Sequence, residues 1–585
     1  MARVVAKMLC PERGVEGFAA PSLEDHPRLL RALRANKVPL LSLNLNLPPL
    51  APFYTSDAFQ QACREEEAQR ASLRAEYSCV RQALEGAGIR DVLIKSAGIV
   101  PSFPYMTDNL DTLVALEQGA QARKVLLELG YVELKNVEEP HKFLFRKFHL
   151  GTTISAIHLH EFVGWGTGFM DDEGLLARAR QAADDPALWI PSAEDALLVT
   201  MAHAFYEDKA VRLGDLWKVM YILRQGELDW EGIYRQVRLR GWEEGLDACI
   251  WLWAGLERAL YGAHSFPKGL ARQAQERSPA SSRRYLARSL AADEEHETFP
   301  FRISFAFSKS QYYRKIWRDG TLSWQQKASD AFKHSLAGVR RRLPWKVQRP
   351  MLVTLSGIDG SGKTIQANML KRAFGECDIK ARIVWNRGGS SRLTDLIIAL
   401  VKPLLRGEQG LDTTSDTREA KVARKSFWLR RPGLRWGWSV LVVLDLLLSY
   451  WARVSWPLSW GQVVICDRYA YDALVELAVL SGGLEIARSF EAKLLLGLSP
   501  RPRLAYLLDA GPAIAHERKP DEELEFLEAQ AAAYRQMAPA WGLRILDANG
   551  DLAACADALV RKVLRTYYEG RERYFYHQDI KTQRH

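Results

Sequence analysis

Short apolar runs alternate with helix-length amphipathic segments in the last third of the chain. Three of the runs, Met351–Ser356, Gln462–Asp467 and Leu504–Asp509, are each six residues long and almost continuously apolar. Such runs are typical of strands that are buried on both faces of a parallel sheet. The alternation therefore predicts an α/β domain over 349–570, with a parallel sheet flanked by helices.

The pattern before residue 349 is different. Residues 22–90 have helical spacing, and short strand-like runs follow with a helix over 119–129. In the segment NLDTLVAL, Asn109, Asp111 and Leu113 fall on one strand face, because side chains alternate with a period of two. From 193 to 261 the apolar spacing is again helical. The pattern predicts an α+β domain that ends in a helical half.

Changes in composition suggest where the domains begin and end. The stretch 263–348 is mixed in charge, poor in long apolar periodicity and ends in GVRRRLPWKVQRP, which predicts a helical, basic connector. The predicted organisation is a helical extension (1–69), the α+β domain (70–262), the connector (263–348), the α/β domain (349–570) and a tail (571–585).

Bulk composition narrows the classes of partner and compartment. A formal charge of +10 spread over 585 residues is mild, and it favours phosphorylated small molecules over nucleic acid. The seven cysteines include no CxxC pair, as expected for a reducing compartment without a structural zinc site. No run reaches the roughly 20 apolar residues of a membrane span, and the N-terminus lacks a signal-peptide core. We expect a cytoplasmic protein; the sequence does not indicate its oligomeric state.

A phosphate-binding loop follows the first predicted strand of the α/β domain. The sequence GIDGSGKT fits the pattern GxxxxGK[ST] between a strand and a helix. Glycines let backbone amides turn inward around a phosphate, and the helix N-terminus adds free N–H donors. Lysine reaches the β- and γ-phosphates, and the hydroxyl ligates Mg²⁺. The predicted ATP-binding residues are Gly357, Asp359, Gly360, Ser361, Gly362, Lys363 and Thr364.

The strand QVVICD ends in Asp467, and Arg468 follows directly. A carboxylate at the end of such a strand is placed beside the Mg²⁺ of a nucleotide. Thr364 and Asp467 are therefore the predicted metal ligands of this domain.

GIDGSGKTIQ, CDRY, YLLDAGPAIAHERK and LRILDANGDLAACADALVRKVL resemble, in order, the landmarks of thymidylate kinases over about 220 residues. The resemblance implies a doubly wound parallel sheet and transfer of the γ-phosphoryl group of Mg-ATP to a nucleoside monophosphate. It implies catalytic roles for Lys363, Asp467, Arg468 and Arg518, with Arg468 on the acceptor phosphate and Arg518, beside Lys519, in a lid.

Two departures from this family concern the acceptor. The turn after the second strand reads WNRGG, where the family has an Arg-Glu-Pro-Gly-Gly turn. Leu446 and Leu448 lie near the positions where the family presents an Arg and a Gln to thymine. Hydrogen-bonding groups discriminate between bases far better than apolar walls. We therefore expect a small-molecule phosphate acceptor, either a nucleoside monophosphate or another compound, and thymidylate is not required.

The segment 424–460 allows two interpretations. Basic residues precede an apolar stretch edged by tryptophans, a pattern found in helices that lie on membrane surfaces. The favoured interpretation is a helix packed on the sheet before the Asp467 strand, as the family layout requires. Peripheral membrane contact is the alternative.

The α+β region resembles a poorly characterised family of nucleotidyltransferase fold. VLIKSAG supplies the lysine turn at Lys95–Ser96, and PYMTDNLDTLV supplies a DxD-like strand on which Asp111 keeps one metal-ligand position. Asn109 takes the first acidic position, with Asp108 beside it, and His158 takes the third; these replacements make the domain a degenerate one. His203 and Asp215 match the helical half. His141, His149, His158 and His160 suggest a transition-metal site. His158 and His160 share a strand face, but the sequence identifies no clear third ligand.

Three functions remain open from the sequence. The first is an ATP-dependent kinase of the nucleoside monophosphate type, fused to the nucleotidyltransferase-like domain. In the second, ATP drives a conformational switch without an acceptor. In the third, the N-terminal domain is a working nucleotidyltransferase and the α/β domain is ancillary.

Overall fold

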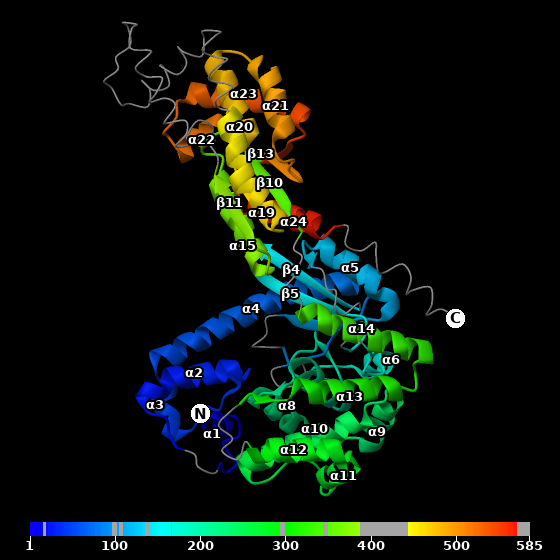
Figure 1. The fold of residues 1–585 in the computed structure, drawn as a ribbon. Helices are drawn as coiled ribbons and strands as arrows, with labels where there is room; N and C mark the ends of the chain where they lie inside the picture. Colours follow the sequence, from blue (N-terminus) through cyan, green and yellow to red (C-terminus); the bar gives the residue numbers. More distant parts are fainter. Residues whose placement is uncertain are drawn as a thin grey trace. The chain divides into compact units, whose positions relative to one another are not determined.

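The computed structural model describes residues 1–15, 19–95, 102–103, 109–134, 141–164, 167–292, 299–342, 349–385 and 443–569. The chain folds into two compact units. Unit 1 comprises residues 1–147 and 154–344, and unit 2 comprises 148–153 and 345–585. Each unit is described by itself below, with the element labels of Figure 1.

A five-stranded sheet forms the centre of unit 2. Its strands are β10 (Met351–Ser356), β11 (Ala381–Trp385), β12 (Val463–Asp467), β13 (Leu504–Asp509) and β14 (Arg544–Asp547). Their order in the sheet is β11-β12-β10-β13-β14, and every adjacent pair is parallel. The chain thus moves to one side of β10 and later to the other. Ligands of open α/β sheets bind at such a switch point, beyond the carboxyl ends of the strands.

Helices connect these strands and pack against one another. α15 packs against α24, and α20 packs against α23. β10 and β12 are buried along their whole length, as their apolar sequences require. The helical elements are α15 (Lys363–Glu376), residues 443–450, η6 (Trp451–Ser455), α19 (Trp456–Ser459), α20 (Ala470–Ser481), η7 (Ile486–Arg488), α21 (Phe490–Leu498), α22 (Pro512–Arg518), α23 (Leu524–Trp541) and α24 (Leu552–Tyr568).

Unit 1 contains a mixed five-stranded sheet in the order β1-β2-β5-β4-β3. β1 (Val92–Leu93) is antiparallel to β2 (Leu110–Leu113), which is parallel to β5 (Thr152–His160). β4 (Lys142–His149) lies beside β5 and pairs antiparallel with β3 (Val132–Leu134). The parallel register pairs Asp111 of β2 with His158 of β5.

Helices make up the rest of unit 1, with two small two-stranded pairs. Most of the helical elements of this unit share one apolar core, whereas α5 (Gly119–Glu128) packs with the sheet in a second one. The helical elements are α1 (Ala2–Leu9), η1 (Leu23–Asp25), α2 (His26–Ala35), η2 (Leu40–Ser42), η3 (Pro48–Leu50), α3 (Ala51–Tyr54), α4 (Asp57–Gly86), η4 (Leu116–Gln118), α5 (Gly119–Glu128), α6 (Asp172–Arg178), α7 (Ala193–Ala202), η5 (His203–Asp208), α8 (Leu213–Arg224), α9 (Trp230–Leu239), α10 (Glu243–Tyr261), α11 (Leu270–Arg277), α12 (Ala280–Ala292), α13 (Phe305–Arg318) and α14 (Trp324–Arg342). The pairs are β6 (Arg180–Gln181) with β7 (Trp189–Ile190), and β8 (Ala210–Val211) with β9 (Phe301–Arg302).

The stretch expected to be a connector, 263–348, contains α11 to α14. Its buried apolar side chains, among them Leu286, Tyr312 and Ile316, belong to the same core as α7, α8 and α10. The low apolar periodicity arises because each of these helices contributes only a few side chains to that core.

The mixed α/β character predicted from the sequence is confirmed, with one fully parallel sheet and one mixed sheet. Among the helices of the described ranges, none combines the length and apolar character needed to cross a bilayer. The turn at 386–389, the basic run 424–435 and the tail 571–585 lie outside the described residues.

Candidate functional site

The loop between β10 and α15 has the backbone that the glycine pattern predicts. Gly357, Gly360 and Gly362 have φ values of 146°, 81° and 90°, which lie in the region that favours glycine. A Cβ built on Gly360 would lie 2.1 Å from the carbonyl oxygen of Ala515 in α22. The loop therefore packs directly on the backbone of the helix that follows β13, and its path depends on that contact.

Gly360→Ala is expected to lower the affinity for Mg-ATP at least about tenfold, because the added methyl group displaces the loop from α22 and strains its backbone. Isothermal titration calorimetry checks the affinity. Gly375→Ala is the matched control, since its Cβ meets nothing within 4 Å and its φ is not positive. Equal affinities of the two variants would show that the loop does not depend on its contact with α22.

Lys363 is the first residue of α15, and its ammonium group lies within the loop. Nζ donates to the carbonyl oxygens of Gly357 and Ile358 at 2.9 and 2.7 Å, and it approaches Ser361 Oγ at 3.3 Å. Burial lowers the pKa of Lys363, and the carboxylates of Asp472 and Asp467 oppose this shift. The predicted phosphate-binding lysine thus points into the loop rather than away from it.

Thr364 and Asp467 lie together at the carboxyl ends of β10 and β12. The Thr364 hydroxyl donates to Asp467 Oδ2 at 2.5 Å. Burial raises the pKa of Asp467, while the Thr364 hydrogen bond and the Lys363 charge lower it. A hydroxyl and a carboxylate are oxygen donors of the kind that Mg²⁺ prefers, so the donor set fits the predicted ion.

Two cations meet the carboxylate of Asp359 inside the loop. Arg468 makes an ion pair with Asp359, and Lys519 Nζ lies 3.4 Å from its other oxygen. Arg468 has a φ of 76°, an uncommon value for a residue with a Cβ. Lys519 Nζ also lies 3.9 Å from Asp521. The guanidinium and the ammonium beside the loop are groups of the kind that bind a phosphate.

Arg518 lies elsewhere in the described structure. Its guanidinium donates to the carbonyl oxygen of Ala548 at 3.0 Å, just beyond the end of β14. Of the pair expected in a lid, Lys519 therefore contacts the loop and Arg518 does not.

Asp472, in the first turn of α20, was not identified from the sequence. Its carboxylate accepts hydrogen bonds from Ser356 Oγ, Tyr534 Oη and the Tyr469 amide, each at 2.7 Å. A longer bond of 3.3 Å comes from the amide of Gly357. Asp472 therefore joins the end of β10, the start of the loop, α20 and α23. In the sequence it reads as an ordinary acidic residue in the first turn of a helix.

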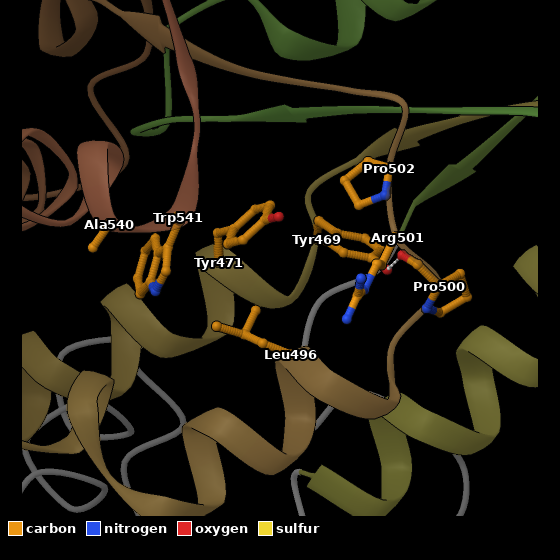
Figure 2. A pocket seen from close by; sticks show the side chains of 8 residues that line it. All are labelled: Tyr469, Tyr471, Leu496, Pro500, Arg501, Pro502, Ala540 and Trp541. Carbon is orange, nitrogen blue, oxygen red and sulfur yellow. Dashed lines mark hydrogen bonds between the residues drawn. The ribbon is translucent and has the colours of Figure 1, made fainter.

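A hollow of about 210 Å³ lies beside the start of α20 (Figure 2). None of the residues that line it belongs to the loop 357–364. Tyr469 donates through its hydroxyl to the carbonyl oxygen of Pro500 at the rim of this hollow. Its lining is Tyr469, Tyr471, Leu496, Pro500, Arg501, Pro502, Ala540 and Trp541.

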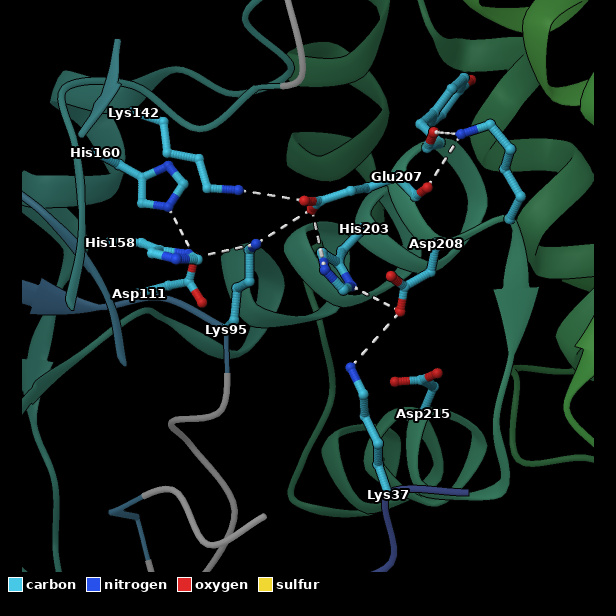
Figure 3. Close-up of polar contacts among 12 residues, drawn as sticks. Lys37, Lys95, Asp111, Lys142, His158, His160, His203, Glu207, Asp208 and Asp215 are labelled. Carbon is cyan, nitrogen blue, oxygen red and sulfur yellow. Dashed lines mark hydrogen bonds and ion pairs between the residues drawn. The ribbon is translucent and has the colours of Figure 1, made fainter. Parts of the chain in front are cut away.

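In unit 1, polar side chains from the sheet and from the helical half converge on Asp111 (Figure 3). His160 Nε2 lies 2.8 Å from Asp111 Oδ1, and His158 Nδ1 lies 3.4 Å from the same oxygen. Lys95 Nζ approaches that oxygen at 3.0 Å. The parallel pairing of β2 with β5 brings these residues together, because it places Asp111 opposite His158.

Glu207 connects this cluster to the helical half. It accepts from Lys95, Lys142 and His203 at 3.2, 3.2 and 3.0 Å. Glu207 lies in η5, a π-helical turn; such turns are frequent at functional sites. His203, at the start of η5, also lies 3.8 Å from Asp208, which pairs with Arg212. His203 thus faces the cluster.

Asp215 takes no direct part in the cluster around Asp111. Its carboxylate accepts from the amide of Arg212 at 3.0 Å and lies in the first turn of α8. In the described part of the chain, Asp215 therefore stabilises the start of α8 and does not join the residues that contact Glu207.

Charge and burial set the protonation states around Asp111. Burial alone would raise the pKa of Asp111, but the Lys95 charge and the two imidazoles beside its carboxylate hold that pKa well below its usual value. Burial would likewise lower the pKa of Lys95, and the carboxylates of Asp111 and Glu207 outweigh it and raise that pKa. Burial lowers the pKa of His160 to about 4. At neutral pH the cluster holds ionised carboxylates, charged lysine and a neutral His160.

Lys218 of α8 is a buried cation next to this cluster, and its ammonium donates to the carbonyl oxygen of Lys95. Burial lowers its pKa from 10.5 to about 8. Between these values the folded state loses its proton before the unfolded state does, so the free energy of unfolding rises with pH. Lys218→Met removes the cost of the buried charge, which is larger at pH 7. The stabilisation of unit 1 by this substitution is therefore expected to be about 1–2 kcal/mol greater at pH 7 than at pH 9.5.

Urea unfolding at the two pH values checks the Lys218 prediction. Lys268→Met, at an exposed position of the same unit, should change the free energy of unfolding equally at both. A Lys218→Met effect that does not depend on pH would show that the amine is not perturbed by burial.

The comparisons with known proteins agree with both resemblances. Residues 22–256 match the model of a family described as "Uncharacterised nucleotidyltransferase". The predicted resemblance of the N-terminal region is thereby confirmed.

The C-terminal part of the chain is similar to two thymidylate kinases. A thymidylate kinase of Symbiobacterium thermophilum is 24% identical over 187 residues, which cover 32% of this chain and 75% of that protein. A "Probable thymidylate kinase" of Pyrococcus horikoshii is 28% identical over 165 residues, which cover 28% of this chain and 65% of that protein. The thymidylate kinase resemblance is thus confirmed, at low identity.

The nucleotidyltransferase-like region departs from the chemistry that its family name implies. Nucleotidyl transfer uses two or three carboxylates to hold a pair of Mg²⁺ ions. In the described sheet, Asp111 is paired with His158 of β5, and His160 contacts the same carboxylate. This donor set does not fit a two-magnesium site. Ser96 and Asp108 lie outside the described residues.

Proposed function

We propose that unit 2 is a P-loop kinase of the nucleoside monophosphate type. It transfers the γ-phosphoryl group of Mg-ATP to the phosphate of a small acceptor. The observation that carries this proposal is the loop 357–364 at the switch point of a parallel sheet, with Lys363 inside it and Thr364 hydrogen-bonded to Asp467. The similarity to two thymidylate kinases supports the same reaction class.

Different residues in and beside the loop bind different parts of Mg-ATP. Backbone amides after Gly357 and at the start of α15 surround the phosphates, and the Lys363 ammonium exchanges the carbonyl oxygens of Gly357 and Ile358 for phosphate oxygens. Thr364 and Asp467 are the residues that would hold Mg²⁺. When bound, this ion neutralises phosphate charge and orients the β- and γ-phosphates.

The acceptor phosphate binds beside Asp359 in this proposal. Arg468 and Lys519 both contact Asp359, so their combined charge exceeds that of its carboxylate. An incoming phosphate dianion takes over part of the Arg468 contact, which brings the acceptor next to the γ-phosphate. The placement of Arg468 beside the loop supports an enzyme with a true acceptor over a switch driven by ATP alone.

The base of the acceptor need not be thymine. Leu446, at one of the expected base-reading positions, is 2% exposed and packs in the interior, and Leu448 is 55% exposed. Neither side chain offers a hydrogen bond to a base edge. We therefore propose a phosphate-bearing acceptor whose recognition depends on its phosphate more than on a thymine ring.

The identity of the product distinguishes the possible reactions. Labelled Mg-ATP is incubated with nucleoside monophosphates and phosphosugars, and with lipid alcohols as acceptors that carry no phosphate, for the wild type and for Lys363→Met and Asp111→Asn. ADP release that requires an acceptor and is lost in Lys363→Met supports the kinase. Pyrophosphate release lost only in Asp111→Asn supports nucleotidyl transfer by unit 1. ADP release without any acceptor supports the switch and contradicts the kinase.

A further inference from the structure

Asp111, His158 and His160 bring three metal-ligating groups to one place in unit 1 (Figure 3). One ligand atom from each lies within 4.8 Å of the other two. Two of the separations are 2.8 and 3.4 Å. Ligand atoms around a tetrahedral zinc ion, with bonds of about 2.1 Å, are about 3.4 Å apart. The three side chains thus have nearly the spacing that such an ion requires.

We propose that Asp111, His158 and His160 bind one divalent transition-metal ion of the zinc type, in place of the magnesium pair expected for a nucleotidyltransferase fold. Two imidazoles and one carboxylate suit zinc and neighbouring transition metals, whereas magnesium prefers oxygen donors. Three protein ligands leave a fourth position for water or an anionic oxygen. This inference does not rest on the kinase proposal for unit 2.

One ring nitrogen of each imidazole faces Asp111. His160 is 2% exposed, and its Nε2 lies 2.8 Å from Asp111 Oδ1, so a bound metal ion would replace this hydrogen bond. His158 Nδ1 is likewise buried and makes no hydrogen bond among the described residues, although it faces Asp111 at 3.4 Å. Buried polar atoms without partners are rare in folded proteins. A metal ion between these groups would give His158 Nδ1 a partner.

Lys95 positions the carboxylate of Asp111, but it also competes with a metal ion for that carboxylate. Lys95 Nζ lies 3.0 Å from the oxygen of Asp111 that faces the imidazoles. Lys95 has a second partner in Glu207 at 3.2 Å, so its ammonium can remain paired when a metal takes the Asp111 oxygen. The positive charge of Lys95 nevertheless weakens metal binding by repulsion. We therefore expect the loss of Lys95 to raise the affinity for the metal ion, and the loss of either histidine to lower it.

Cobalt(II) titration tests the site directly. The full chain, without a histidine tag, is stripped of metal and titrated with Co²⁺, and the visible d–d absorption reports coordination. The Asp467→Asn background removes the carboxylate of the separate magnesium site in unit 2. We expect one equivalent of Co²⁺ to bind, to be displaced by Zn²⁺ and to resist excess Mg²⁺.

Single substitutions identify which side chains bind the metal ion. His158→Ala and His160→Ala should each weaken Co²⁺ binding at least about tenfold. His141→Ala should leave it unchanged, because His141 pairs with Glu161 outside the cluster. Lys95→Met should strengthen Co²⁺ binding about tenfold, since it removes a competing cation. Circular dichroism and thermal unfolding of Lys95→Met check that its gain of affinity does not come from thiols and imidazoles exposed by misfolding.

Three outcomes would overturn the site. They are a wild-type spectrum without d–d bands, unchanged affinity in both His158→Ala and His160→Ala, or displacement of Co²⁺ by Mg²⁺ at equal concentration. Lys363→Met should bind Co²⁺ like the wild type. Failure of the metal site and failure of the kinase are therefore distinguishable.

Discussion

Lys363→Met is expected to lower acceptor-dependent ADP release by a factor of about 10²–10³, the cost of removing one preorganised donor from a charged transition state. The ammonium is enclosed by the carbonyl oxygens of Gly357 and Ile358, so it is already placed where phosphates bind. Methionine keeps much of the side-chain length and apolar volume while removing the charge. Steady-state kinetics with a saturating acceptor, followed by ADP release, measures the effect.

Lys371→Met is the matched control for this substitution, because Lys371 is an exposed lysine on the same helix, α15. Its activity should stay within about twofold of the wild type, as is usual for an exposed position. If Lys363→Met and Lys371→Met retain equal activity, the loop does not carry out phosphoryl transfer.

Asp472→Ala is expected to destabilise unit 2 by about 3–5 kcal/mol, which is the range for removing one partner of a buried charged network. The substitution leaves Ser356, Tyr469 and Tyr534 without the acceptor that they share. It also removes a contact at the start of the loop 357–364, because the Gly357 amide loses its hydrogen bond to Asp472. Urea unfolding, with hydrogen exchange in β10 to identify the transition, gives the free energy.

Glu528→Ala serves as the comparison, since Glu528 is exposed on α23, the helix that also carries Tyr534. It should change the free energy of unfolding by less than about 0.5 kcal/mol. A similar small loss for Asp472→Ala would mean that the network around Asp472 contributes little to the loop.

The sequence predicted the local elements of unit 2 well because each depends on a short, continuous signal. The apolar runs at Met351–Ser356 and Leu504–Asp509 are β10 and β13 with unchanged bounds, and the third run begins one residue later as β12. The glycine spacing of the loop likewise follows from backbone conformation alone. Such features need no knowledge of distant residues.

The resemblance placed Asp111 and His158 in one site, and the parallel pairing of β2 with β5 brings them together. Partners that come from other elements escaped prediction. Lys142 and Glu207 come from a strand and a π-helical turn. Asp472 carries no distinguishing sequence signal, because an acidic residue in a first helical turn is common. The contacts of Asp111 with His160 and Lys95 likewise became visible only in the fold.

The positions of individual side chains follow the sequence pattern for some residues and not for others. Lys363, Thr364 and Asp467 lie together as the phosphate-binding pattern requires. Arg518 contacts the backbone of Ala548, and Lys519 takes the place near the loop. A short helix, α22, turns successive side chains by about 100°, so neighbouring residues face different groups. Order in the sequence could not decide which of the two points inward.

A crystal structure with Mg²⁺ and a non-hydrolysable ATP analogue would show directly whether the loop 357–364 binds the triphosphate. We expect the β- and γ-phosphates to lie inside this loop, with Lys363 Nζ moved from the carbonyl oxygens of Gly357 and Ile358 to phosphate oxygens. We also expect Thr364 and Asp467 beside the metal ion. A nucleotide bound elsewhere, with Lys363 still held by its own loop, would contradict the proposed kinase.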